Sequence, residues 1–278
     1  MSPAVHQTAR WVGLVYGRQP GLDDPAELYH EASKISPTQI GRQIEGARRL
    51  EASPELQLSS ARAVKRLGGD PVRLVSPRRP VIGLWDAIEE RCSARTFSDG
   101  ALAADELAAL LRAAYGVTHA LDPSGGEHTL PLRAVPSGGA LYPLEIFAVA
   151  LRVAGLAPGL YHFDPLEAAL ETVRLGTDPR EAAELSTYPE IASSCAALFL
   201  LAAVFGRTRF KYGQRGYRFA LLEAGHVGQN LLLAATGLEL ASVPLGGFYD
   251  RRVDEFLGLD GVDESAVYML AVGRPGAG

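Results

Sequence analysis

Two adjacent residues, Lys211 and Tyr212, have side chains that could take part in proton transfer. The chain carries 24 arginines but three lysines, and the other cations between Arg207 and Arg218 are all arginine. Arginine stays protonated at any accessible pH, whereas an amine can be tuned to give and take a proton. The pattern therefore indicates a titratable site, although a chance lysine in a solvated loop would leave the same pattern.

A second group of residues could bind an anion. Arg91, Ser93 and Arg95 place two guanidinium groups and a hydroxyl within one short segment. An arginine fork and a serine donor suit a phosphate, and the alternative is a helix end whose arginines offset the helix dipole. Arg274, after the last apolar run, could add a phosphate contact or lie in a frayed tail.

Two glycine pairs could bring backbone close to a flat ligand, because glycine has no side chain to obstruct the approach. Neither segment matches G-x-G-x-x-G or a Walker loop, so neither predicts a dinucleotide or a nucleoside triphosphate. Each could also be an ordinary turn. The residues are Pro136, Ser137, Gly138 and Gly139 in the first segment and Leu245, Gly246 and Gly247 in the second.

Composition limits the possible classes of function. The 278 residues are 47% hydrophobic and 21% charged, with a net charge of -5, which is typical of a soluble globular protein and does not indicate a nucleic-acid partner. Cys92 and Cys195 are too few for a disulfide framework, and no Cys/His cluster suggests a metal site, so we expect a reducing cytoplasm. We see no signal peptide in residues 1–8. The apolar stretch 219–243 contains polar residues, which favours a buried helix over a membrane span.

The pattern of residues changes near position 80. Residues 1–80 are rich in charge, serine and proline, and Ser76–Pro80 is typical of a linker. We therefore expect an N-terminal extension over residues 1–80 and one domain over residues 81–278.

Within the domain, apolar spacing over 105–115 follows one helix face, and several short apolar runs are typical of strands. Helices and strands mixed in this way predict an α+β fold with a mostly antiparallel sheet. The predicted helices cover 25–34, 39–50, 84–91, 105–115, 178–186 and 219–237, the predicted strands 11–16, 144–153, 159–163, 170–175, 196–205 and 266–273, and a loop 122–133.

In their order and spacing, these segments resemble the FMN-dependent nitroreductase superfamily, and within it the SagB-type branch that includes the azoline oxidases. The resemblance covers about residues 81–275. Its most specific parts are Pro136–Pro143 and Phe210–Asn230, and residues 28–34 are similar to the N-terminal region of the branch.

The resemblance implies a nitroreductase-like fold with a mostly antiparallel central sheet flanked by helices, in an intertwined homodimer with two FMN sites at the interface. It also implies roles for the segments described above. By this resemblance, the FMN phosphate and ribityl chain are bound by Arg91, Ser93, Arg95 and Arg274, and the isoalloxazine ring lies against Pro136, Ser137, Gly138 and Gly139. The N5 region of the flavin contacts Leu245, Gly246 and Gly247, and the catalytic residues are Lys211 and Tyr212.

The activity that the resemblance implies is oxidation of thiazoline or oxazoline rings to thiazoles or oxazoles, in a ribosomal or a carrier-bound peptide. Either Lys211 or Tyr212 could be the base, and a cyclodehydratase or synthetase subunit could be a partner. Two alternatives remain open: NAD(P)H-dependent reduction of nitroaromatics or quinones, and a non-catalytic, flavin-containing scaffold subunit. The sequence leaves open which peptide and ring are preferred, and what residues 1–80 do.

Overall fold

The computed structural model of the protein describes residues 24–35, 37, 45–121 and 129–276. The strand predicted over Trp11–Tyr16 lies outside these residues, as does the first part of the helix predicted over Gln39–Leu50.

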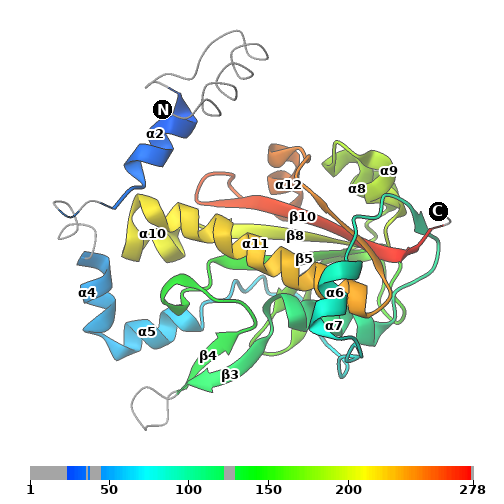
Figure 1. Cartoon of the computed structure of the whole chain (residues 1–278), viewed down its shortest axis with the longest axis horizontal. Helices are drawn as coiled ribbons and strands as arrows, with labels where there is room; N and C mark the ends of the chain where they lie inside the picture. Colours follow the sequence, from blue (N-terminus) through cyan, green and yellow to red (C-terminus); the bar gives the residue numbers. More distant parts are fainter. Residues whose placement is uncertain (1–23, 36, 38–44, 122–128, 277–278) are drawn as a thin grey trace.

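A central antiparallel sheet forms the middle of the molecule (Figure 1). Its strands follow the order β1-β7-β6-β5-β8-β10-β2, β9 also pairs with β10, and β3 and β4 form a separate hairpin. The paired strands are antiparallel, which confirms the predicted sheet type. The strands are β1 (Pro71–Arg73), β2 (Phe97–Ser98), β3 (Val117–Leu121), β4 (Leu130–Arg133), β5 (Leu144–Ala150), β6 (Gly159–Asp164), β7 (Ala169–Leu175), β8 (Ala197–Val204), β9 (Ala241–Leu245) and β10 (Glu264–Pro275).

Helices cover both faces of the sheet, as predicted. One face packs against α7 and α11, and the other against α8, α9 and α12. The helices are α2 (Pro25–Ala32), α4 (Glu45–Glu51), α5 (Pro54–Ala61), α6 (Leu84–Glu90), α7 (Ala104–Tyr115), α8 (Pro179–Leu185), α9 (Pro189–Ser194), α10 (Gly206–Tyr212), α11 (Gln214–Gly237) and α12 (Asp250–Leu257), with the 3-10 turn η1 (Gly138–Ala140).

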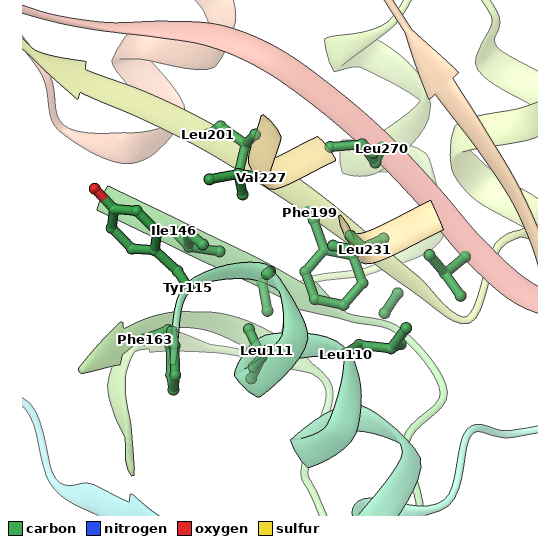
Figure 2. Close-up of a cluster of buried hydrophobic side chains, with 14 of the residues drawn as sticks. Leu110, Leu111, Tyr115, Ile146, Phe163, Phe199, Leu201, Val227, Leu231 and Leu270 are labelled. Carbon is green, nitrogen blue, oxygen red and sulfur yellow. The ribbon is translucent and has the colours of Figure 1, made fainter. Parts of the chain in front are cut away.

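Two hydrophobic cores result from the alternation of side chains along the central strands. In β5, Ile146 points into the core beneath α7 and α11, whereas Phe147 points into the core beneath α8, α9 and α12. Figure 2 shows the first core, where Leu111 of α7, Phe199 of β8 and Leu231 of α11 meet. A strand buried on both faces needs no polar alternation, which explains the continuous apolar runs in the sequence.

The long apolar helix begins earlier than predicted. It starts at Gln214 instead of Phe219, and a short helix, α10, precedes it. Gly213 separates the two helices with a φ of 55°, a conformation that glycine adopts without strain. Of the loop predicted over residues 122–133, residues 122–128 lie outside the described part of the chain, and the end of the prediction is wrong, because Leu130–Arg133 forms β4 and pairs with β3. Within the described residues, no helix is long and apolar enough to cross a membrane.

Candidate active site

The structure brings the Lys–Tyr pair and the first glycine pair together. Lys211 and Tyr212 end α10, and the Lys211 ammonium lies 5.2 Å from the centre of the Tyr212 ring. A Cβ on Gly139 would lie 2.8 Å from Lys211 Nζ and 2.8 Å from Tyr212 OH. The two polar groups thus converge on the backbone of Gly139, where the missing side chain makes room for them.

The loop around Gly139 has a constrained backbone. The φ angles of Gly139, Ala140 and Tyr142 are 69°, 53° and 44°, and such values are unfavourable for the two non-glycine residues. Ser137 stabilises the turn by accepting a 2.9 Å hydrogen bond from the Tyr142 amide on its Oγ. Strained backbone of this kind persists where the surrounding contacts enforce it, and it is concentrated at functional sites.

A buried carboxyl group, Glu223 of α11, lies behind this loop. Its side chain accepts a 2.6 Å hydrogen bond from Tyr115, while its Oε2 atom has no hydrogen-bond partner. Burial raises the pKa of Glu223 to about 7, even though Ser137, Tyr115 and Arg133 each act to lower it. Glu223 therefore changes protonation near neutral pH, unlike an exposed glutamate.

Arg133 supplies the positive charge nearest to this carboxyl group. Its guanidinium carbon lies beside two aromatic rings that contact each other edge-on, 4.5 Å from the centre of Tyr115 and 4.6 Å from that of Tyr142. The Arg133 amide donates a 2.9 Å hydrogen bond to the Tyr142 hydroxyl. These contacts fix the two tyrosines, and with them the far end of the glycine loop.

A further arginine joins α10 to the same loop. Arg207, in the first turn of α10, donates to the carbonyl of Tyr142 at 3.3 Å and to Glu145 at 2.5 Å. Burial raises the pKa of Glu145, but hydrogen bonding to His162 and the charge of Arg207 together bring it below its usual value. Glu145 is therefore an anion, and it anchors Arg207 where α10 meets the loop.

The predicted phosphate-binding segment lies at the surface beside β9. The amide of Ala94 donates a 3.0 Å hydrogen bond to the carbonyl of Ser242, which fixes the segment to the start of that strand. Ser93 and Arg95 are exposed and Arg91 is half-buried. Their side chains are accessible to an anion in solution.

Arg274 is held by a buried carboxylate. Glu106, which is fully buried, accepts bonds of 3.0 Å and 2.7 Å from Arg274 and one of 3.0 Å from Arg78. Arg274 also donates its Nε–H to the carbonyl of Ala101. A guanidinium group has five N–H bonds, so two remain for another ligand. The predicted phosphate contact of Arg274 remains a prediction.

The second glycine pair follows β9. Gly246 is exposed, and a Cβ placed on it would meet no atom within 4 Å. The carbonyl of Gly247 accepts hydrogen bonds from the Thr187 amide at 3.0 Å and the Thr187 hydroxyl at 2.9 Å, and Leu245 is buried in the sheet. The loop is therefore anchored at Gly247 and open at Gly246.

Two groups of predicted site residues lie toward opposite ends of α11. α10, which ends in Lys211 and Tyr212, lies at its start, and α6, which precedes the Arg91–Arg95 segment, lies near its end (Figure 1). Gly138 packs against Phe219, whereas Ile82, just before α6, packs against Gly237. At 1.5 Å per residue, about 27 Å of helix separates these two contacts. The Arg91–Arg95 segment is bonded at Ala94 to Ser242, just beyond the end of α11, whereas the Ser137–Gly139 loop contacts α11 near its start.

Sequence reasoning did not identify Glu223, Tyr115, Arg133 or Arg207 as site residues. One signal was present, because Glu223 is an acidic residue within the most apolar helix of the chain. A buried glutamate is rare unless it is paired or functional. Arg133 and Arg207 carried no comparable signal, since arginine is the usual cation of this chain.

The nitroreductase family model matches residues 88–274. The chain belongs to the nitroreductase family. This confirms the resemblance to the superfamily and the nitroreductase-like fold, and it supports an oxidoreductase. The nitroreductase-like protein MJ1384 of Methanocaldococcus jannaschii is 34% identical over 206 residues, which are 74% of this chain and 98% of that protein.

Other similarities cover parts of longer proteins. The microcin B17-processing protein McbC of Escherichia coli is 35% identical over 136 residues, 46% of this chain and 49% of McbC. The trifolitoxin-processing protein TfxB of Rhizobium leguminosarum is 31% identical over 154 residues, 54% of this chain and 41% of TfxB. The chain thus matches about half of each. A chain of the E. coli microcin synthetase McbBCD complex shares the fold, with a TM-score of 0.56, 24% identity and coverage of 100% of this chain and 95% of that chain.

Proposed function

We propose that the protein is an FMN-dependent dehydrogenase of the SagB type that oxidises thiazoline or oxazoline rings in a peptide to thiazoles or oxazoles. The observation that carries the proposal is the convergence of Lys211 Nζ and Tyr212 OH on Gly139. A base beside a cofactor loop is the arrangement that such a dehydrogenation needs. Similarity to two peptide-processing proteins, McbC and TfxB, supports a peptide substrate.

The residues present fit FMN. Arg91, Ser93 and Arg95 offer accessible cationic and hydroxyl donors for a phosphate, and Gly246 leaves its backbone open to a flat ring. Bound FMN would accept a hydride from one carbon of the azoline ring and would be reoxidised by oxygen.

The chain's own part in the reaction is proton removal and orientation. Lys211 or Tyr212 would take the proton from the neighbouring ring carbon, so that the ring loses one proton and one hydride and becomes aromatic. Arg207 would orient α10, since it lies in that helix's first turn and donates a hydrogen bond to the carbonyl of Tyr142.

Two copies of the chain would complete each site. The distance along α11 separates the two groups of cofactor-binding residues within one copy, so a partner copy would bring the glycine loop to the arginine segment. Exposed apolar side chains near both ends of α11 are suited to such an interface, because large apolar patches commonly mark contact surfaces. Trp85 is 70% exposed, Leu84 is 72% exposed and Leu222 is 55% exposed.

The test starts from the visible absorption of the purified protein. We expect a flavin band that bleaches when a thiazoline peptide is added without air. Lys211→Ala and Tyr212→Phe should retain FMN and lose most of the bleaching rate, whereas Lys34→Ala, which removes an exposed side chain paired with Glu31, should behave as the wild type. Loss of FMN in the first two variants would make the pair structural and refute its catalytic role.

A second candidate function is NAD(P)H-dependent reduction of nitroaromatics or quinones, which the similarity to MJ1384 along nearly its whole length favours. Bleaching by NADPH, with none by the peptide, would support it. Formation of the heterocycle by a Lys211→Ala variant within a synthetase complex would instead support a scaffold subunit. The fold shared with a chain of the McbBCD complex supports including a cyclodehydratase or synthetase partner in that assay.

A further inference from the structure

The N-terminal part of the chain contacts the helix that carries the Lys–Tyr pair. α4 packs against α10 through Gly46, and a Cβ placed on Gly46 would lie 2.7 Å from Lys211 Cα and would overlap the carbonyl of Phe210. Real Cβ contacts are not this short. Because the obstructing atoms belong to the backbone, no side-chain rotation can relieve the overlap. The two helix backbones therefore touch directly at Gly46.

The opposite side of α10 is held in a similar way by α11. A Cβ on Gly216 would lie 2.6 Å from the carbonyl carbon of Thr208, and the Thr208 hydroxyl donates a 2.9 Å hydrogen bond to the Gly216 carbonyl. α10 is thus packed between two glycine contacts, one from the domain and one from α4. A short helix of seven residues has little stability of its own, so its position follows these contacts.

Other residues before position 80 fix the same end of the molecule. Ser33 follows α2 and accepts hydrogen bonds from Arg218 on its hydroxyl and from Arg215 on its carbonyl, at 2.5 Å and 3.1 Å. Tyr29 of α2 contacts the ring of Tyr217 edge-on, with 5.3 Å between ring centres. These contacts join α2 to the first turns of α11, directly after the Lys–Tyr pair.

We propose that α4 is a positioning element of the active site, and that Gly46 sets the position of α10 and thereby of Lys211 Nζ and Tyr212 OH over Gly139. The catalytic meaning of this placement rests on the proposed function, whereas the placement itself does not. α4, within residues 1–80, would thus have a role in the active site that the sequence alone did not indicate.

The test compares two glycine substitutions. Gly46→Ala forces α4 and α10 apart, whereas Gly206→Ala, in the first turn of α10, adds a methyl group that meets no atom within 4 Å. Because the chain has three lysines, protein labelled with 13Cε-lysine gives few NMR signals, and a Lys211→Arg variant identifies the one from Lys211. Turnover of a thiazoline peptide and retention of FMN are measured on the same samples.

We expect Gly46→Ala to shift the Lys211 signal, to leave the signal of Lys65 unchanged, and to lower kcat at least tenfold with FMN retained. Gly206→Ala should change none of these. An unchanged Lys211 signal in a folded Gly46→Ala protein would overturn the proposal. A shifted signal with unchanged turnover would support the positioning and would instead count against Lys211 as the base.

A second variant covers the case in which Gly46→Ala does not fold. Leu50, on α4, is buried at 3% exposure, so Leu50→Ala loosens the attachment of α4 without forcing a steric overlap. We expect a smaller shift of the Lys211 signal in the same experiment. A Leu50→Ala protein whose Lys211 signal and kcat both match the wild type would also overturn the proposal.

Discussion

The buried carboxyl group of Glu223 makes the stability of the protein depend on pH. Its pKa is about 7 in the folded protein, compared with 4.5 in an unfolded chain. A carboxyl group with a raised pKa stabilises the fold fully below pH 4.5, and this contribution is lost as the pH rises through about 7. At 1.36 kcal/mol per unit of pKa, the loss amounts to about 3 kcal/mol.

Replacing Glu223 by Gln isolates this effect. The amide keeps an acceptor for the Tyr115 hydroxyl but carries no charge at any pH, so the penalty for ionising the buried group disappears. We expect the variant to gain about 3 kcal/mol relative to the wild type between pH 4.5 and pH 8. Urea unfolding of both proteins at a series of pH values, under identical buffer conditions, gives this difference.

The control is Glu184→Gln, because Glu184 is an exposed glutamate of α8. The difference in free energy of unfolding between the Glu184→Gln protein and the wild type should vary little over the same range of pH. If the difference between Glu223→Gln and the wild type also stayed constant, the carboxyl group would ionise as freely in the fold as in water. That result would refute its burial behind the loop.

Two further predictions concern the loop and the arginine cluster. In Gly139→Ala, a φ of 69° is unfavourable for alanine, and the added Cβ would meet Lys211 Nζ and Tyr212 OH. We therefore expect about 1–3 kcal/mol of destabilisation in thermal unfolding. We also expect at least a tenfold loss of turnover in an assay of peptide oxidation. Glu106→Gln removes the negative charge that holds Arg274 and Arg78, so we expect the free energy of unfolding to fall by about 1–3 kcal/mol and FMN to bind more weakly. If flavin fluorescence titrations gave an unchanged affinity, Arg274 would not contact the cofactor.

Elements whose periodicity is set by burial were predictable from the sequence. The apolar spacing over 105–115 gave the helix that the structure shows as α7, because that helix packs one face on the core. α10 was not predicted, since its run of basic residues has no apolar face and its conformation depends on contacts with α4 and α11. β9 was not predicted either, because Ser242 and Pro244 interrupt the strand pattern.

The residues of the site were predictable one segment at a time, but their arrangement was not. Local motifs pointed to Lys211, Tyr212 and Gly139 separately, and each carries a chemical signal in its own segment. That both polar groups meet at Gly139 depends on how α10 packs against α4 and α11. The contact of Gly46 with Lys211 joins positions far apart in the chain, and a glycine carries no sign of which backbone it approaches.

The position of β10 in the sheet has a consequence for how the chain folds. β10 joins β2, β8 and β9, and all three are synthesised before it. Until residues 264–275 are made, β8 presents an unpaired apolar edge, which is a template for pairing between chains. Pairing strands so distant in sequence is also slow. Newly made chains therefore pass through a state that is prone to aggregation. A higher rate of synthesis should increase the fraction of the protein that is insoluble.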